Sequence, residues 1–236
     1  MRQLIHGDCL AELPKMAVSS VDMVLADPPY GMTRNRWDCR IDLAALWPEL
    51  RRVCKPSAAM VLTAAPPFDK MLAMSNADDY RYDWVWEKGN ATGHLNSSRM
   101  PLKAHENVCV FYREPPTYHP QKTNGHKPVN SFYTRHSGSN YGKADAARAG
   151  GGSTERFPRT VLKLSSDKQT SNRHSTQKPL ALMRYMVRTY TNLDETVLDF
   201  CMGGGTTALA CALEGRKFVG IEIDANTFSV AKRACQ

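Results

Sequence analysis

The sequence predicts an α/β protein built on a doubly wound, mostly parallel β-sheet. Short apolar strands alternate with helical segments toward both ends of the 236-residue chain, which is typical of parallel strands joined by helices. The strand–helix–strand–helix unit that closes the chain has two strands, too few for a stable sheet of its own. We therefore expect the two ends of the chain to build one sheet together.

The first 113 residues supply the strands and helices of one half of this sheet. A continuous apolar strand is predicted at Val21–Ala26, and a helix follows at Asp42–Val53, with Asp42 as its N-cap. A second buried strand is predicted at Ala58–Ala64, before two prolines. Aromatic and β-branched residues then predict strands at Tyr82–Glu87 and Val108–Tyr112.

The last 60 residues supply the other half. Proline in the first turn favours a helix at Leu180–Tyr190. A strand at Thr196–Asp199 and a helix at Thr206–Leu213 follow, and then a strand at Phe218–Ile223 and a final helix at Ala225–Cys235.

Between these halves the regular pattern disappears. Residues 114–172 are rich in Gly, Pro, Ser, Thr and Lys and show no hydrophobic period, so we expect no regular secondary structure there. A stretch of this length inside a compact domain is typical of a functional insert or a mobile loop. The predicted division is one domain from residues 1–113 and 174–236, with an irregular insert at residues 114–173.

Charge is concentrated in this insert. The chain has a net charge of +8, and the stretch from Arg113 to Arg173 has 11 Lys and Arg against 4 Asp and Glu, which is +7. A basic stripe confined to one segment indicates a polyanionic partner. The alternative is a solvated loop of a basic protein.

Composition excludes several classes. No apolar run approaches the ~20 residues of a membrane span, and the N-terminus does not read as a signal peptide, so we expect a cytoplasmic protein without membrane insertion. The seven cysteines are scattered without a Cys-x-x-Cys pair. This spacing argues against a disulfide framework and a structural zinc site.

A glycine-rich motif, Asp-Phe-Cys-Met-Gly-Gly-Gly-Thr-Thr-Ala, runs from Asp199 to Ala208 between a strand and a helix. Glycines allow a tight turn and close approach to a ligand, and the helix N-terminus offers unpaired N–H groups. Glu222 closes the next strand, where an acid can bind ribose hydroxyls. The pattern predicts a nucleotide-like cofactor and is equally compatible with a nicotinamide dehydrogenase; a purely structural turn is the other alternative.

A second motif, Asp27-Pro28-Pro29-Tyr30, follows the first buried strand. Ligands of open α/β sheets bind beyond such strand ends. The prolines stiffen the turn, so the Asp27 carboxylate and the Pro28 carbonyl are two acceptors that suit an NH₂ group. The ring of Tyr30 offers a flat face on which a base can stack. Taken alone, the motif is also compatible with a plain strand-ending turn.

Together the two motifs resemble those of the DNA amino-methyltransferases, and their order, active site before cofactor motif, resembles the β group of that family. The resemblance extends to Ile5–Cys9, Trp86–Lys88, His105–Asn107 and His174–Pro179. Departures from the family's usual residues lie at Phe200 and Cys201, at Gly204 and at Ser175. The resemblance implies a Rossmann-like methyltransferase sheet in circularly permuted order, with a target-recognition insert.

It also implies S-adenosylmethionine as cofactor and no metal. The implied catalytic residues are Asp27, Pro28, Pro29 and Tyr30, and the implied cofactor-binding residues are Asp8, Asp27, Lys178, Asp199, Phe200, Cys201, Gly203, Gly205, Thr206, Thr207, Glu222 and Asp224. In this scheme Lys178 pairs with the cofactor's carboxylate, Glu222 takes the ribose and Asp8 the adenine amine. The target base is flipped out of the duplex before reaction.

The implied substrate is double-stranded DNA, and Asp at the first motif position favours adenine N6 over cytosine N4. From charge alone, the expected DNA contacts are Lys122, Lys127, Arg135, Lys143, Arg156, Arg159 and Lys163, with the loop Gly89–Lys103 as the alternative surface. RNA as substrate and a DNA-binding subunit without catalysis are the remaining alternatives. A homodimer and a restriction partner stay open.

Overall fold

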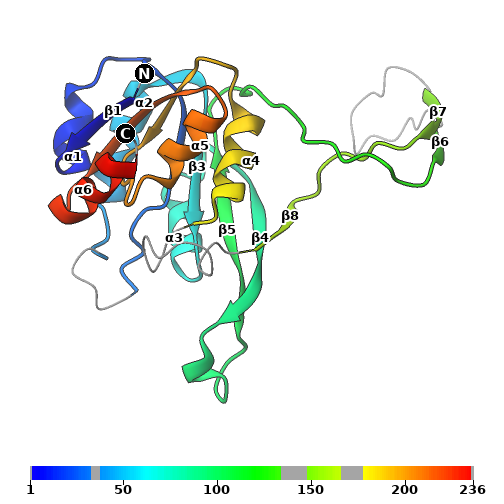
Figure 1. Cartoon of the computed structure of the whole chain (residues 1–236), viewed down its shortest axis with the longest axis horizontal. Coiled ribbons are helices and arrows are strands. Elements are labelled where there is room, and N and C mark those ends of the chain that lie inside the picture. The colour runs from blue at the N-terminus through cyan, green and yellow to red at the C-terminus, as the bar shows by residue number, and fades with distance from the viewer. Residues whose placement is uncertain (1, 33–37, 134–147, 166–177, 235–236) are drawn as a thin grey trace. The chain divides into compact units, whose positions relative to one another are not determined.

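The computed structural model describes residues 2–32, 38–133, 148–165 and 178–234. Two compact units are present, one from Met1–His119 with Thr160–Gln236 and one from Pro120–Arg159. The larger unit holds an eight-stranded sheet and six α-helices among the described residues (Figure 1). None of the helices in these ranges combines the length and apolar character needed to cross a bilayer.

The helices and strands of the larger unit follow the chain in a regular alternation. They are β1 (Arg2–His6), α1 (Cys9–Glu12), β2 (Val21–Ala26), α2 (Leu43–Val53), β3 (Cys54–Ala64), α3 (Phe68–Ser75), β4 (Tyr80–Thr92), β5 (Lys103–Phe111), β8 (Val161–Leu164), α4 (Leu180–Tyr190), β9 (Thr196–Asp199), α5 (Thr206–Leu213), β10 (Lys217–Glu222) and α6 (Ala225–Ala234). Short 3₁₀ turns lie at η1 (Leu13–Lys15) and η2 (His94–Asn96).

The strand order of the large sheet is β1-β10-β9-β2-β3-β5-β4-β8. The pairings from β1 through β3 are parallel, β5 is antiparallel to both of its neighbours, and β8 is parallel to β4. In the described sheet β5 alone therefore runs against the other strands. The predicted mostly parallel sheet, built jointly by the two ends of the chain, is confirmed.

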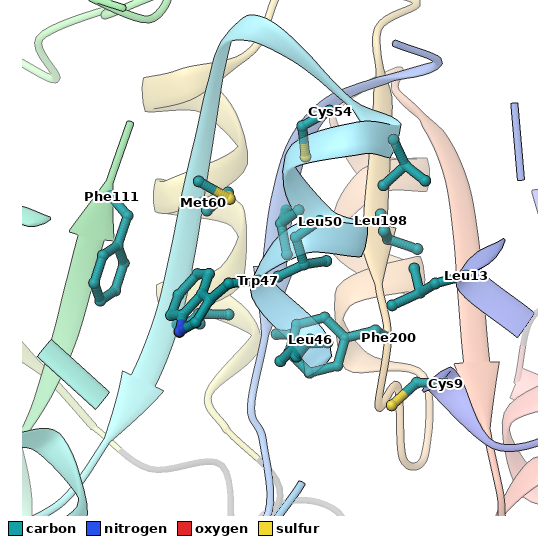
Figure 2. Close-up of a cluster of buried hydrophobic side chains, with 14 of the residues drawn as sticks. Cys9, Leu13, Leu46, Trp47, Leu50, Cys54, Met60, Phe111, Leu198 and Phe200 are labelled. Carbon is teal, nitrogen blue, oxygen red and sulfur yellow. The ribbon is translucent and has the colours of Figure 1, made fainter. Parts of the chain in front are cut away.

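The central strands are apolar because both of their faces are covered. Along β2, Val24 and Ala26 pack with α1, α2 and α3 in one core cluster, while Met23 and Leu25 pack with α4, α5 and α6 in the other. This alternation is the two-residue period of a strand between two helical layers. Figure 2 shows the first cluster, with Trp47 and Leu50 of α2 against Met60 of β3.

Local signals set several boundaries as expected. The side chain of Asp42 accepts hydrogen bonds from Ala44 N at 2.9 Å and Ala45 N at 3.4 Å, which confirms it as the N-cap of α2. The predicted limits of α4, β9 and α5 agree with the observed ones, and β10 lies one residue earlier. The strands expected at Ala58–Ala64 and Tyr82–Glu87 extend beyond those bounds at one or both ends.

The expectation of no regular structure in residues 114–172 is wrong at three strands. β6 (Val129–Tyr133) and β7 (Arg148–Ser153) form an antiparallel pair within the smaller unit. β8 adds to the large sheet beside β4, and Val85 N donates to Thr160 O at 2.7 Å. Because β7 is glycine-rich and β8 has four residues, backbone pairing with a partner strand stabilises both without a clear local signal.

A buried tyrosine links α4 to the sheet. Trp84 Nε1 of β4 donates to the Tyr190 hydroxyl at 2.7 Å, and the Tyr82 and Tyr190 hydroxyls lie 2.7 Å apart. Tyr190 and Trp84 are both buried. These hydrogen bonds hold α4 against the sheet. Lys178 lies two residues before the start of this helix.

We predict that Tyr190→Phe lowers the free energy of unfolding by about 1–3 kcal/mol, since it leaves a buried indole N–H without an acceptor. Tyr82→Phe, which leaves the Trp84 bond in place, should cost about 0.5–1.5 kcal/mol. Urea denaturation of the two variants measures the difference. Equal losses would contradict the assigned role of the Trp84 bond.

Candidate active site

One cavity of about 810 Å³ lies at the carboxyl edge of the large sheet. Its walls come from the segments that follow β1, β2, β9 and β10 and from β4 and β5. This is the edge at which ligands of open α/β sheets bind, and the volume is that of a small-molecule site. The aspartate–proline motif and the glycine-rich motif both line this cavity, although about 170 residues separate them in the chain.

Nearly all the sequence-predicted catalytic and cofactor residues line the cavity. These are Asp8, Asp27, Pro28, Pro29, Tyr30, Lys178, Asp199, Phe200, Cys201, Gly203, Thr206, Thr207, Glu222 and Asp224. Gly205 is not part of the lining. It precedes α5 with a φ of 87°, a left-handed conformation that favours glycine, so its role is to begin the helix.

Asp27 is held through a single carboxylate oxygen. Its Oδ1 accepts hydrogen bonds from the Tyr30 hydroxyl at 2.8 Å and from the Thr63 hydroxyl. Lys178 Nζ lies 2.9 Å from the same Oδ1. Among the described residues no donor contacts Oδ2. The carboxylate is therefore oriented by three groups on one oxygen, and the other oxygen has room for a further donor.

A ring-stacking contact and a cation–π contact hold the Tyr30 ring. It stacks on Phe68 at 5.1 Å between ring centroids, and Lys178 Nζ lies 5.3 Å from its centre. Burial is the main cause of a raised pKa for the Tyr30 hydroxyl, with the negative charge of Asp27 second. Tyr30 therefore stays protonated and donates to Asp27. The expected stacking of a base on this ring stays a prediction.

Lys178 belongs to a chain of alternating charges. Its Nζ lies 2.9 Å from Asp27 and 3.0 Å from Glu106 Oε2, and Lys88 Nζ lies 2.5 Å from Glu106 Oε1. The Lys178, Glu106 and Lys88 side chains are 9%, 14% and 11% exposed. Burial opposes the charge of Lys178, but the carboxylates of Asp27 and Glu106 outweigh it and hold its pKa well above the usual value. Likewise, burial favours neutral Glu106, yet the two lysines lower its pKa.

The glycine-rich half of the cavity is organised around Glu222. Its Oε2 accepts from Gly203 N at 2.9 Å and its Oε1 from Asp224 N at 2.9 Å. Both oxygens are thus fixed at the end of β10. Gly203 has a φ of 52°, which favours glycine, and a Cβ added at Gly204 would meet open space. The turn therefore leaves room for a ligand against its backbone.

Asp199 is buried where β9 meets this turn. It accepts from Cys201 N at 3.2 Å, and burial raises its pKa to about 7. Asp8 and Asp224 instead cap the segments after β1 and β10. Asp8 Oδ1 accepts from Leu10 N at 2.8 Å, and Asp224 Oδ1 accepts from Thr227 N at 2.7 Å.

The positively charged residues expected to contact DNA are not gathered in one unit. Lys122, Lys127, Arg156 and Arg159 lie in the smaller unit, Lys163 lies in β8 of the larger one, and Arg135 and Lys143 lie outside the described residues. Lys122 pairs with Glu155 at 2.9 Å and Lys163 with Glu87 at 3.3 Å. Arg156 donates to backbone carbonyls of its own unit, including Ser153 O at 3.0 Å. Arg156 therefore has a structural task, whereas Lys127 and Arg159 are exposed.

Sequence reasoning assigned no role to three residues that complete the site: Thr63, Glu106 and Lys88. Each of the three is a polar residue within or beside a predicted apolar strand. Polar residues are rarely buried without a partner, so this placement is the signal that could have identified them. Residues 174–177 of the motif that contains Lys178 lie outside the described residues.

Comparison with known proteins places this site in a family. A family model described as DNA methylase matches residues 21–233. The DNA adenine methyltransferase YhdJ of Escherichia coli (strain K12) is 27% identical over 252 residues, with 98% of this chain and 82% of YhdJ covered.

Two solved structures have a similar fold. The M1.HpyAVI–SAM complex has a TM-score of 0.63 at 24% identity, with 99% of this chain and 100% of that chain covered. The cytosine-N4-specific PvuII DNA methyltransferase has a TM-score of 0.69 at 15% identity, with 98% and 85% covered. Since the family model spans both motifs that line the cavity, the chain belongs to the DNA methylase family.

Proposed function

We propose that this chain transfers a methyl group from S-adenosylmethionine to the exocyclic amine of adenine (N6) in double-stranded DNA. The observation that carries the proposal is the orientation of Asp27 by three groups on one oxygen, in the same cavity as the glycine-rich turn and Glu222. YhdJ, a relative over almost the whole chain, is named an adenine methyltransferase, and M1.HpyAVI was solved with SAM.

The residues of the cavity fit this cofactor. Glu222 would take its ribose, the open turn at Gly203 and Gly204 would hold its methionine part, and Asp199 would face its ammonium group. Asp8, which follows β1, would accept a hydrogen bond from the adenine amine of the cofactor. When bound, the cofactor supplies a methyl group on a positively charged sulfur.

The chain's own residues orient the base. Asp27 Oδ2 and the Pro28 carbonyl would accept the two N–H bonds of the flipped amine, which directs the nitrogen lone pair outward. Lys178 and Glu106 act as positioning residues, because Lys178 holds the Asp27 carboxylate through Oδ1 and Glu106 in turn holds Lys178. Fixed dipoles and charges of this kind stabilise the positive charge that develops on nitrogen.

Cytosine N4 is the alternative target. The PvuII enzyme, which is cytosine-N4-specific, has a similar fold, and the chemistry is the same for either amine. Asp27 at the first motif position favours adenine. The nicotinamide dehydrogenase has no support beyond the glycine pattern, and the intact set of site residues speaks against an inactive subunit.

Asp27→Ala should lower turnover by at least about a hundredfold, as expected for the loss of one preorganised polar group. Methyl transfer from labelled cofactor to unmodified DNA measures it, with Asp78→Ala as the matched control at an exposed aspartate. Adenine and cytosine are told apart by sequencing the product. Near-normal transfer by a folded Asp27→Ala protein would remove the active-site assignment.

Lys178→Met separates two roles for the buried lysine. If it positions Asp27, turnover should fall at least about tenfold while the dissociation constant of S-adenosylmethionine changes less than about threefold. Glu222→Ala is the comparison, since it should weaken cofactor binding. A Lys178→Met protein with weakened cofactor affinity and normal turnover would instead support the pairing with the cofactor's carboxylate.

Cofactor affinity should depend on the ionisation of Asp199. The cofactor's ammonium group favours the ionised carboxylate, and the pKa of Asp199 in the free protein is about 7. The affinity for S-adenosylmethionine should therefore rise by up to about tenfold per pH unit below about pH 7 and level off above it. Calorimetric titration across about pH 5.5 to 7.5 measures the slope. Asp199→Asn should abolish the rise; an unchanged profile in that variant would contradict the assignment.

A further inference from the structure

The hairpin formed by β4 and β5 ends in an exposed apolar tip. Figure 1 shows this hairpin running beyond the other strands of the large sheet, with its turn away from the helices of that unit. Leu95, in the 3₁₀ turn η2, is 99% exposed, and Met100 and Leu102 are 50% and 37% exposed. A leucine in full contact with water is stabilised when it is buried, so contact of the tip with an apolar group would be favourable.

The tip has a defined backbone. Gly93 has a φ of 94°, which begins the turn. The Asn96 carbonyl accepts from Arg99 N at 2.9 Å and Met100 N at 3.0 Å, and Asn96 N donates to Gly93 O at 3.0 Å. These bonds present Leu95 on a turn that closes on itself rather than on an open loop.

Charge indicates what the tip contacts. From Gly89 to His105 the chain has no Asp or Glu, whereas Arg99 and Lys103 are basic. Asn, Ser and His residues flank Leu95 in the sequence. A basic, amide-rich surface around one protruding leucine matches the inside of a nucleic-acid duplex, where phosphates flank stacked bases, better than a lipid or a protein groove.

The hairpin also joins the active site. Asn90, Ala91 and Thr92 of β4 line the cavity that contains Asp27. Leu95 lies three residues beyond Thr92, so no more than about 10 Å of extended chain separates it from the wall of the cavity. The hairpin that presents the tip is thus part of the wall of the cavity in which a target base would bind.

We propose that the β4–β5 hairpin is a wedge that enters duplex DNA beside the target base, with Leu95 occupying the space from which that base is displaced. Apolar wedges from other proteins unstack base steps in this way. Arg99 and Lys103 bind the phosphates next to the opened step. This inference rests on the proposed function, because it assigns the opening of the duplex to a surface of the same site.

The test uses the full chain and an oligonucleotide duplex containing the site that the unaltered protein methylates, identified first by sequencing treated plasmid DNA. The variant is Leu95→Ser. The matched control is Leu193→Ser, a 69% exposed leucine before β9, at the opposite end of the strands from the cavity. A second duplex places an abasic site opposite the target base, so that no pairing has to be broken.

Leu95→Ser should lower kcat/KM on the paired duplex by at least about tenfold and on the abasic duplex by less than about threefold, since an unpaired base is displaced at little cost. Its affinity for S-adenosylmethionine and the activity of Leu193→Ser should be unchanged. Unaltered activity of Leu95→Ser on the paired duplex, or an equal loss on both duplexes, overturns the wedge. If the unaltered protein methylates no DNA at all, the proposed function fails, and the wedge fails with it.

Discussion

A buried ammonium group is stable only beside opposite charge, and Lys178 meets this requirement through two carboxylates from different strands. Asp27 follows β2, Glu106 lies in β5, and Lys178 itself precedes α4. The charge requirement therefore joins three segments that are distant in the sequence. Lys88 of β4 is the fourth charge of the array and balances the second carboxylate, that of Glu106. The array is held in one place only if β2, β3, β5 and β4 are neighbours in the sheet, as they are.

The antiparallel β5 makes this neutral array possible. Because β5 runs against the other strands, its first residues lie at the edge where the parallel strands end. Glu106 thus reaches the cavity from the start of its strand, and Asp27 and Glu222 reach it from the ends of theirs. A fully parallel sheet would present Glu106 at the opposite edge.

The two halves of the cavity have different electrostatic characters. Around Asp27, fixed opposite charges keep the carboxylate oriented. Around the glycine-rich turn, Asp199 is buried with no cation in contact among the described residues, and burial raises its pKa to about 7. A cationic ligand would relieve this cost, whereas the Asp27 half is already balanced. This difference supports the proposal that the glycine-rich side takes a positively charged group and the Asp27 side a neutral amine.

The sequence by itself determined the strands with continuous apolar runs, the capped helices and the two motifs, because each depends on neighbouring residues. It also determined that both motifs follow strand ends, and hence that they meet at one edge. Tertiary structure alone decided the rest. β8 forms by pairing with the distant strand β4, and β6 and β7 form by pairing with each other. The roles of Thr63, Glu106 and Lys88 depend on which side chains lie across the sheet. Such contacts have no local period or spacing, so only the folded chain brings them together.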